Sequence, residues 1–254
     1  MSVEIPVTVA CPNCNSIQQV GYRFCSSCGQ RNPIAVQKAE RQDQKYQRNL
    51  KFLSIFAILC LVFVISSSFG EETLEQEIYW SIAFAVIVLV FIILQPETLR
   101  VIIPNRSFLK PLLVIFFIGI SSGFIVSYLM DKLNLLLFEE TYIYLHVYKE
   151  SKHPLLMALI FIGVFPAVFE ELAFRGFVFN NLQELAGNNS AIWGSAFLFG
   201  LVHLSLLSLI WIIPFGLLLS YFRNKYSTLF YGVIGHFTHN STVVMIEYFN
   251  VYNY

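Results

Sequence analysis

The sequence is dominated by long stretches of apolar residues with few or no ionisable side chains. Seven such stretches occur, at residues 52–69, 78–94, 111–130, 154–169, 191–204, 208–222 and 229–246. A helix of about 17–25 apolar residues is long enough to cross a bilayer. The backbone finds no hydrogen-bond partner in hydrocarbon, so each stretch is expected to be helical.

Composition excludes the soluble alternative. Apolar residues make up 56% of the 254 residues and charged residues 13%, against about 45–50% and about 25% in ordinary soluble domains. Too few polar side chains remain to solvate a bundle of this size, and the net charge of zero argues against a nucleic-acid-binding domain. The sequence therefore predicts an all-α polytopic membrane protein with about seven or eight transmembrane helices.

The distribution of basic residues predicts the orientation of these helices. Residues 1–51 carry seven of the sixteen Lys and Arg residues, whereas residues 70–77 contain four Glu and no Lys or Arg. Basic loops stay in the cytoplasm, and the later basic connections agree with this assignment: Arg100, Arg106, Lys110, Arg223 and Lys225. No signal-peptide pattern opens the chain. We expect an integral protein of the bacterial plasma membrane with a cytoplasmic N-terminus.

Two CxxC pairs stand before the first apolar stretch. Cys11 and Cys14 form one pair and Cys25 and Cys28 the other, ten residues further on. Four thiolates at this spacing are typical of a tetrahedral zinc site, and a complete Cys₄ shell leaves no open position for catalysis. Disulfides are the alternative, but a cytoplasmic head keeps its thiols reduced. Residues 1–31 are therefore predicted to be a zinc ribbon with structural zinc and a possible protein partner.

Residues 32–51 are polar and basic. They are expected to form a juxtamembrane linker, either as a helix attracted to anionic lipid or as a solvated segment. Residues 52–153 then hold the N-terminal transmembrane helices and an outer loop, and residues 154–254 hold the helical core discussed next. Cys60, alone in an apolar stretch, is interpreted as a packing residue.

Ionisable residues inside apolar stretches are candidates for function, because they are costly in a bilayer. Glu170, Glu171 and Arg175 occur at the end of the fourth stretch. On a helix, Glu171 and Arg175 share a face. Glu170 points about 140° away from Arg175, at 100° per residue, and is left to face a cavity.

Two further clusters lie in the fifth and seventh stretches. His203 follows Phe199 by four residues, and His236 precedes Asn240 by four, with the role of His239 left open. Two hydrolytic chemistries fit this set. Either Glu170, His203 and His236 hold a metal whose water attacks a carbonyl, or Glu170 and His203 activate water directly. In the second case His236 and Asn240 stabilise the oxyanion.

The motifs EExxxR, FxxxH and HxxxN, in this order, resemble those of the CAAX protease and bacteriocin-processing (CPBP, or Abi) family. The resemblance covers residues 154–245. It implies an all-helical intramembrane endopeptidase, either glutamate-dependent or a metalloprotease. It further implies that Glu170 activates water beside His203, that His236 and Asn240 stabilise the oxyanion, and that Glu171 and Arg175 hold the site in shape.

The implied substrate is a membrane-associated peptide or protein in the lipid bilayer. The motif HExxH and a Walker-type glycine loop are absent from the sequence, which removes the commonest zinc-protease and NTPase assignments. The alternative function is a non-catalytic membrane protein, either a bacteriocin immunity factor or a scaffold. A proton-coupled transporter is disfavoured because no inverted repeat is apparent.

Overall fold

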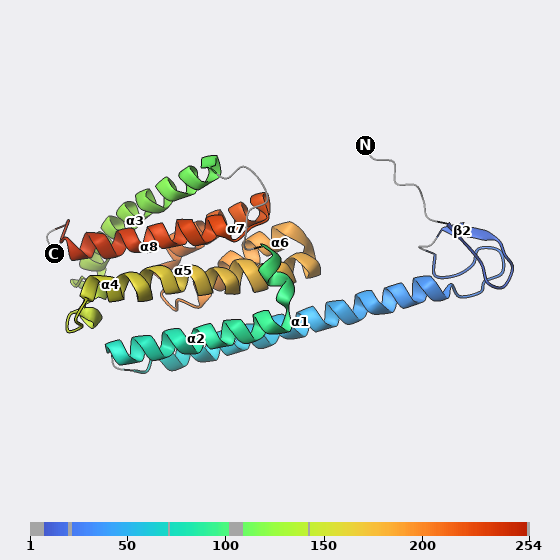
Figure 1. Ribbon diagram of the computed structural model, residues 1–254, viewed down its shortest axis with the longest axis horizontal. Coiled ribbons are helices and arrows are strands. Elements are labelled where there is room, and N and C mark those ends of the chain that lie inside the picture. The colour runs from blue at the N-terminus through green and yellow to red at the C-terminus, as the bar shows by residue number, and fades with distance from the viewer. Residues whose placement is uncertain (1–7, 20–21, 71, 102–108, 142, 253–254) are drawn as a thin grey trace. The chain divides into compact units, whose positions relative to one another are not determined.

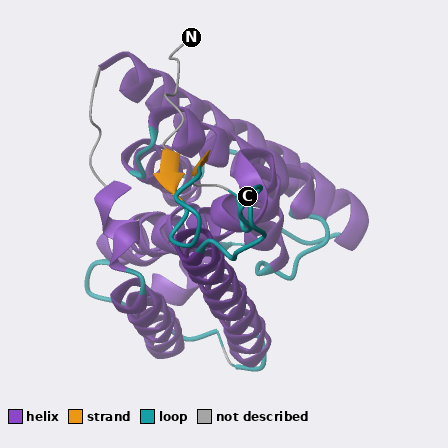
Figure 2. Cartoon of the chain, turned by 90° about the vertical axis from the view of Figure 1, so that its right-hand side faces the viewer, coloured by secondary structure: helices purple, strands orange, loops and turns teal. Residues whose placement is uncertain are grey.

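The computed structural model describes residues 8–19, 22–70, 72–101, 109–141 and 143–252, and the described chain is mostly helical (Figures 1 and 2). Contacts divide the chain into two units, Met1–Lys51 and Phe52–Tyr254. Arg106, placed by its charge in a cytoplasmic loop, lies outside the described residues.

The first unit holds a short antiparallel hairpin of β1 (Thr8–Ala10) and β2 (Ile17–Gln19), with Val9 opposite Gln18. The two CxxC pairs form similar turns. The Asn15 N–H donates to Cys11 O, and the Gly29 N–H donates to Cys25 O, both at 2.9 Å. Both Asn15 and Gly29 have a positive φ, a conformation that Asn and Gly adopt most readily.

Helix α1 (Pro33–Ser67) includes the predicted linker and the first apolar stretch without a break. Helix α2 (Leu74–Leu94) begins at Thr73, whose side chain caps Gln76 N–H. Aromatic pairs join the apolar part of α1 to α2, with Phe56 against Phe91 and Phe63 against Phe84. Because residue numbers rise on one helix as they fall on the other, the two helices run antiparallel, side by side in Figure 1.

Helix α3 (Leu109–Phe138) runs parallel to α8 (Phe230–Tyr248) and packs closely against it. A Cβ atom on Gly119 would fall 2.7 Å from Gly235 O, and one on Gly123 would fall 3.0 Å from His239 O. Glycine at these two positions therefore permits the close approach of the helices.

The fourth and fifth predicted spans are joined in one helical segment, Pro154–Leu201. It comprises α4 (Pro154–Ala158), the π-helical η3 (Leu159–Val164), α5 (Phe165–Glu170), the π-helical η4 (Glu171–Val178) and α6 (Phe179–Leu201). The segment turns sharply at Gly187, whose φ of 83° and ψ of 178° are not helical. Helix α7 (Leu209–Tyr226) follows and packs against α6.

Four helical segments among the described residues are long and apolar enough to cross a membrane: Ala39–Ser67, Leu74–Leu94, Leu109–Phe138 and Pro154–Leu201. The last is a joined pair, and α7 and α8 add 18 and 19 residues. The total of seven or eight spans stays a prediction. Between α3 and α4, the expected outer loop contains the short 3₁₀ helix η2 (Tyr144–Tyr148).

Candidate active site

The EExxxR motif lies in the middle of a helix and not at its end. Glu170 is the last residue of α5, and Glu171 and Arg175 belong to η4. The expectation that the span ends at this motif is wrong, because the helix continues to the turn at Gly187. The charges do not stop the helix because Glu171 and Arg175 neutralise each other inside the protein.

Glu171 and Arg175 form a sealed ion pair. Arg175 Nη1 donates to Glu171 Oε1 at 2.9 Å, and both side chains are fully buried. Arg175 Nη2 also donates to Gly216 O at 3.2 Å, and the guanidinium carbon lies 4.2 Å from the centre of the Phe199 ring. These contacts link η4 to α6 and α7, so the pair is placed to support the fold around the site.

Gly232 of α8 leaves room for this carboxylate. A Cβ atom at position 232 would fall 2.4 Å from Glu171 Oε2. Oε2 itself is buried and has no hydrogen-bond partner among the described residues. Glycine at position 232 therefore allows α8 to pass directly against Glu171.

His236 lies between the two glutamates. Its Nδ1 is 3.3 Å from Glu171 Oε1, and its Nε2 is 3.7 Å from Glu170 Oε2. The side chain is 5% exposed, compared with 21% for Glu170. The imidazole thus joins the sealed ion pair on one side to the more accessible carboxylate on the other.

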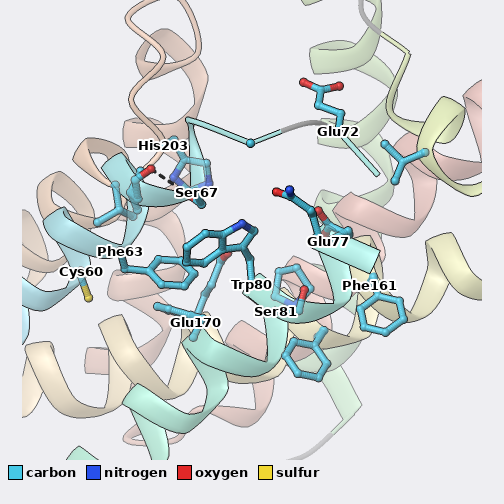
Figure 3. Close-up of a pocket in the computed structure, with 18 of the residues that line it drawn as sticks. Cys60, Phe63, Ser67, Glu72, Glu77, Trp80, Ser81, Phe161, Glu170 and His203 are labelled. Carbon is cyan, nitrogen blue, oxygen red and sulfur yellow. Dashed lines mark hydrogen bonds between the residues drawn. The ribbon is translucent and has the colours of Figure 1, made fainter. Parts of the chain in front are cut away.

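Glu170 and His203 line the same cavity, which has a volume of about 420 Å³ (Figure 3). Side chains of α1 and α2 complete its wall, among them Phe63, Glu77 and Trp80. His203 Nδ1 is 2.8 Å from Phe199 O. A carbonyl oxygen only accepts, so Nδ1 carries the proton and Nε2 is left as the acceptor of the ring.

Asn240 lies apart from this cavity. Its Nδ2 donates to Ile162 O at 2.8 Å, within the π-helical η3. Asn240 lines a second cavity of about 830 Å³, together with His203 and His239. The predicted set therefore does not meet in one cavity: His203 borders both, and His236 is in neither lining.

His239 is buried by neighbouring rings and a hydroxyl. Its Nδ1 is 2.8 Å from Ser122 Oγ on α3, and its ring stacks on Trp211 at 5.0 Å. Cys60 is 2% exposed within the apolar cluster between α1 and α2, as a packing residue would be, and it also borders the smaller cavity.

Arg223 is a site-supporting residue that sequence reasoning assigned only to a cytoplasmic loop. Its Nε donates to Arg175 O at 3.1 Å, and its Nη2 donates to Asn180 Oδ1 at 2.8 Å. The side chain is 6% exposed. Arg223 lies at the end of an apolar stretch, where an arginine that reaches out to the membrane surface has the same sequence pattern. The sequence therefore could not distinguish a buried Arg223 from an exposed one.

The head contains a separate cluster of metal-ligand atoms. The sulfur atoms of Cys11, Cys14, Cys25 and Cys28 all lie within 4.8 Å of one another. Within the described parts of the chain, no other group of three or more His, Cys, Asp or Glu side chains is close enough to hold a metal. Four thiols so arranged could bind a metal such as zinc.

Polar neighbours surround this cluster. Gln18 Nε2 donates to Cys25 Sγ at 2.6 Å, and Ser16 Oγ lies 3.3 Å from the same sulfur. The hydrogen bond with Ser16 lowers the pKa of the Cys25 thiol to about 5. A thiolate is the form that binds metal, so the lowered pKa favours Cys25 as a metal ligand.

The helices, the buried ion pair and the cavity place this chain among membrane proteins with ionisable residues enclosed between helices. Residues 152–242 match the family described as Type II CAAX prenyl endopeptidase Rce1-like. This match confirms the resemblance drawn from the motifs, and all seven motif residues lie within the matched segment. It supports a membrane protease at the level of the family. No curated protein and no solved structure matches the chain.

Proposed function

We propose that the protein is an intramembrane endopeptidase that hydrolyses peptide bonds of membrane-associated proteins or peptides. The observation that carries this proposal is the shared cavity of Glu170 and His203 inside the segment that matches the endopeptidase family. A carboxylate and an imidazole with a free acceptor nitrogen, lining one cavity, are suited to activating water.

In the proposed reaction, Glu170 accepts a proton from a water molecule that His203 helps to orient. The water oxygen then bonds to the substrate carbonyl carbon and forms a tetrahedral intermediate. Collapse of this intermediate breaks the C–N bond as Glu170 returns the proton to the leaving nitrogen. Each step conserves the proton, so the enzyme is regenerated.

His236 and Asn240 are proposed to stabilise the oxyanion of the intermediate. His236 Nε2 lies near Glu170, which fits this role, whereas Asn240 already donates one amide hydrogen to Ile162 O. The primary amide has a second hydrogen to offer. For Asn240 to act on the same intermediate, substrate must join the two cavities that meet at His203.

Glu171 and Arg175 are proposed as positioning residues. Their side chains are sealed from the cavity, so they do not touch the reacting atoms. They fix His236 through its contact with Glu171 Oε1 and fix η4 through Gly216.

The test is a comparison of membrane-protein N-termini by mass spectrometry in cells producing either the wild type or Glu170→Gln at equal levels. We expect N-termini that appear only with the wild type. Glu184→Gln, at an exposed position further along the same helical segment, serves as the matched control and should leave them unchanged. Identical profiles for wild type and Glu170→Gln would contradict proteolysis and favour an immunity or scaffold protein.

We further propose that the head is a zinc ribbon with structural zinc, and that the reaction needs no active-site metal. The thiol cluster and its hydrogen bonds support the first part. Zinc analysis of the purified full-length protein tests both. We expect zinc in the wild type and none in Cys11→Ser/Cys14→Ser, whereas zinc retained by that variant would favour the metalloprotease alternative.

The basic N-terminal residues support a cytoplasmic N-terminus in a bacterial plasma membrane. The lipid bilayer and a membrane-associated substrate are the expected surroundings of the site. A protein partner for the ribbon is part of the same proposal.

A further inference from the structure

The cavity that contains Glu170 and His203 reaches the connection between α1 and α2. Glu72 of that connection is part of its lining (Figure 3). Gly70 and Thr73 also line the cavity. The cavity also extends along α1 to Cys60, seven residues before the helix ends. At 1.5 Å per residue this is a depth of roughly 10 Å, so the cavity enters the helical unit from this end.

Three separate parts of the chain meet at the same end. His146 Nε2 of η2 lies 3.0 Å from Glu72 Oε2. The N–H of Leu145, also in η2, donates to Glu247 Oε2 near the end of α8 at 3.1 Å. The α1–α2 connection, the outer loop and the C-terminal end of α8 therefore lie together around the cavity.

Basic residues gather at the opposite end of this unit. Helix α8 has 19 residues and is therefore roughly 28 Å long, close to the bilayer core of about 30 Å. It begins four residues after α7 ends at Tyr226, where Arg223 and Lys225 lie. Asn181, next to the Arg223 partner Asn180, pairs with Gln95. This contact brings η1 (Pro96–Val101) to the same end.

The charges of the two ends are opposite in sign. Since α3 runs parallel to α8, Lys110 lies at the basic end, and Asp131 lies at the cavity end. The cavity end has three lysines, outnumbered by acidic residues: Glu72, Glu75, Glu77, Asp131, Glu139, Glu140, Glu150 and Glu247. Such a bias places the basic side in the cytoplasm.

We propose that the cavity opens on the non-cytoplasmic side of the membrane, so that its substrates are peptide segments presented from outside the cytoplasm. The statement about substrates rests on the proposed proteolytic function. The orientation of the cavity does not depend on that function or on the number of membrane spans. The cavity lining contains the carboxylates of Glu72, Glu77 and Glu170 and, among the described residues, no Lys or Arg. The segment it admits is therefore neutral or cationic rather than acidic.

Cysteine labelling in intact cells tests the sidedness directly. Glu72→Cys and Lys225→Cys are matched variants at exposed positions of the two ends. Each is made in the full-length chain with Cys60→Ala, which removes the thiol beside the cavity. The Glu72–His146 pair is exposed, so its loss costs at most about 1 kcal/mol. The probe is a membrane-impermeant maleimide, applied before and after permeabilisation.

We expect at least ten-fold more labelling of Glu72→Cys than of Lys225→Cys in intact cells, with the difference lost after permeabilisation. Labelling of Lys225→Cys in intact cells, with Glu72→Cys protected, would overturn the inference. The labelling does not depend on catalysis, so it stands apart from the Glu170→Gln comparison. A protein that labels as expected but yields no wild-type-specific N-termini would refute proteolysis while leaving the orientation intact.

Discussion

Glu170 and Glu171 are neighbours in sequence, yet their side chains lie in two different regions of the molecule. Glu171 belongs to a sealed region with Arg175 and Gly232, where both charged side chains are fully buried. Glu170 belongs to the cavity region with His203 and retains about a fifth of its exposure. One step of about 100° along a helix is enough to separate the two environments.

Within a single motif, Glu171 therefore supports the fold, and Glu170 is available for catalysis. A charge in the sealed region is held by a fixed partner, and its removal leaves the other charge uncompensated. A charge at the cavity can meet water and substrate, and its removal leaves the packing largely unchanged. His236 contacts both glutamates and connects the regions. The following predictions use protein stability to test this division.

Arg175→Leu should have the largest effect. It leaves the Glu171 carboxylate buried without its cation and removes the contacts to Gly216 O and the Phe199 ring. Breaking a buried ion pair costs about 3–5 kcal/mol. We expect little folded protein in detergent, measured by size-exclusion chromatography and thermal melting. Lys225→Met, at an exposed basic residue, is the control and should behave as the wild type. Normal melting of Arg175→Leu would show that the pair does not support the fold.

Gly232→Ala should have the next largest effect. The added methyl group would lie 2.4 Å from Glu171 Oε2, so α8 or the carboxylate must move. Overpacking of this kind costs about 1–3 kcal/mol. We expect a lower melting temperature and a disturbed His236, seen as a reduced rate of substrate cleavage. Gly29→Ala has open space around its Cβ position, and the strain of its positive φ falls on the head, so it should leave the melting of the helical unit unchanged. An unaltered melting temperature in Gly232→Ala would mean that the close approach is easily relieved.

The helical periodicity alone predicted part of this division. It expected Glu171 to share a face with Arg175 and left Glu170 pointing elsewhere, and the structure has the pair at 2.9 Å with Glu170 at a cavity. The apolar stretches likewise predicted helices, because the length of a stretch and its lack of charge are local properties. The four cysteines were placed together for the same reason: CxxC spacing is local.

Long-range packing could not be predicted in the same way. The burial of Arg223 against Arg175 O depends on where α7 ends relative to η4. The hydrogen bond from Asn240 to Ile162 O depends on a π-helical turn in another helix, η3. The sequence pattern of that helix does not predict the turn. The end of the fourth span was also misplaced, because a charge pair neutralised inside the protein does not end a helix.

Asn240→Ala should have a smaller effect on stability than either variant above. It removes the hydrogen bond to Ile162 O, worth about 1 kcal/mol. We expect a modest drop in melting temperature and a larger loss of cleavage, because the proposed oxyanion donor is also removed. Thr242→Ala is the control, since it too loses one hydrogen bond to a helix carbonyl, Thr238 O, without touching the site. If both variants lose cleavage equally, Asn240 acts through helix packing alone.

Glu170→Gln should have the smallest effect on stability and so gives the sharpest test of the comparison. Its contact with His236 spans 3.7 Å, and its side chain is partly exposed. We expect the free energy of unfolding to change by no more than about 0.5 kcal/mol, as for a surface substitution, so that the melting temperature is nearly that of the wild type. We also expect complete loss of wild-type-specific N-termini. A strong loss of stability would show that Glu170, like Glu171, supports the fold. The lost cleavage would then reflect a damaged fold, and the catalytic assignment would lose its support. Unchanged melting with lost cleavage assigns the reaction to the first glutamate and the fold to the second.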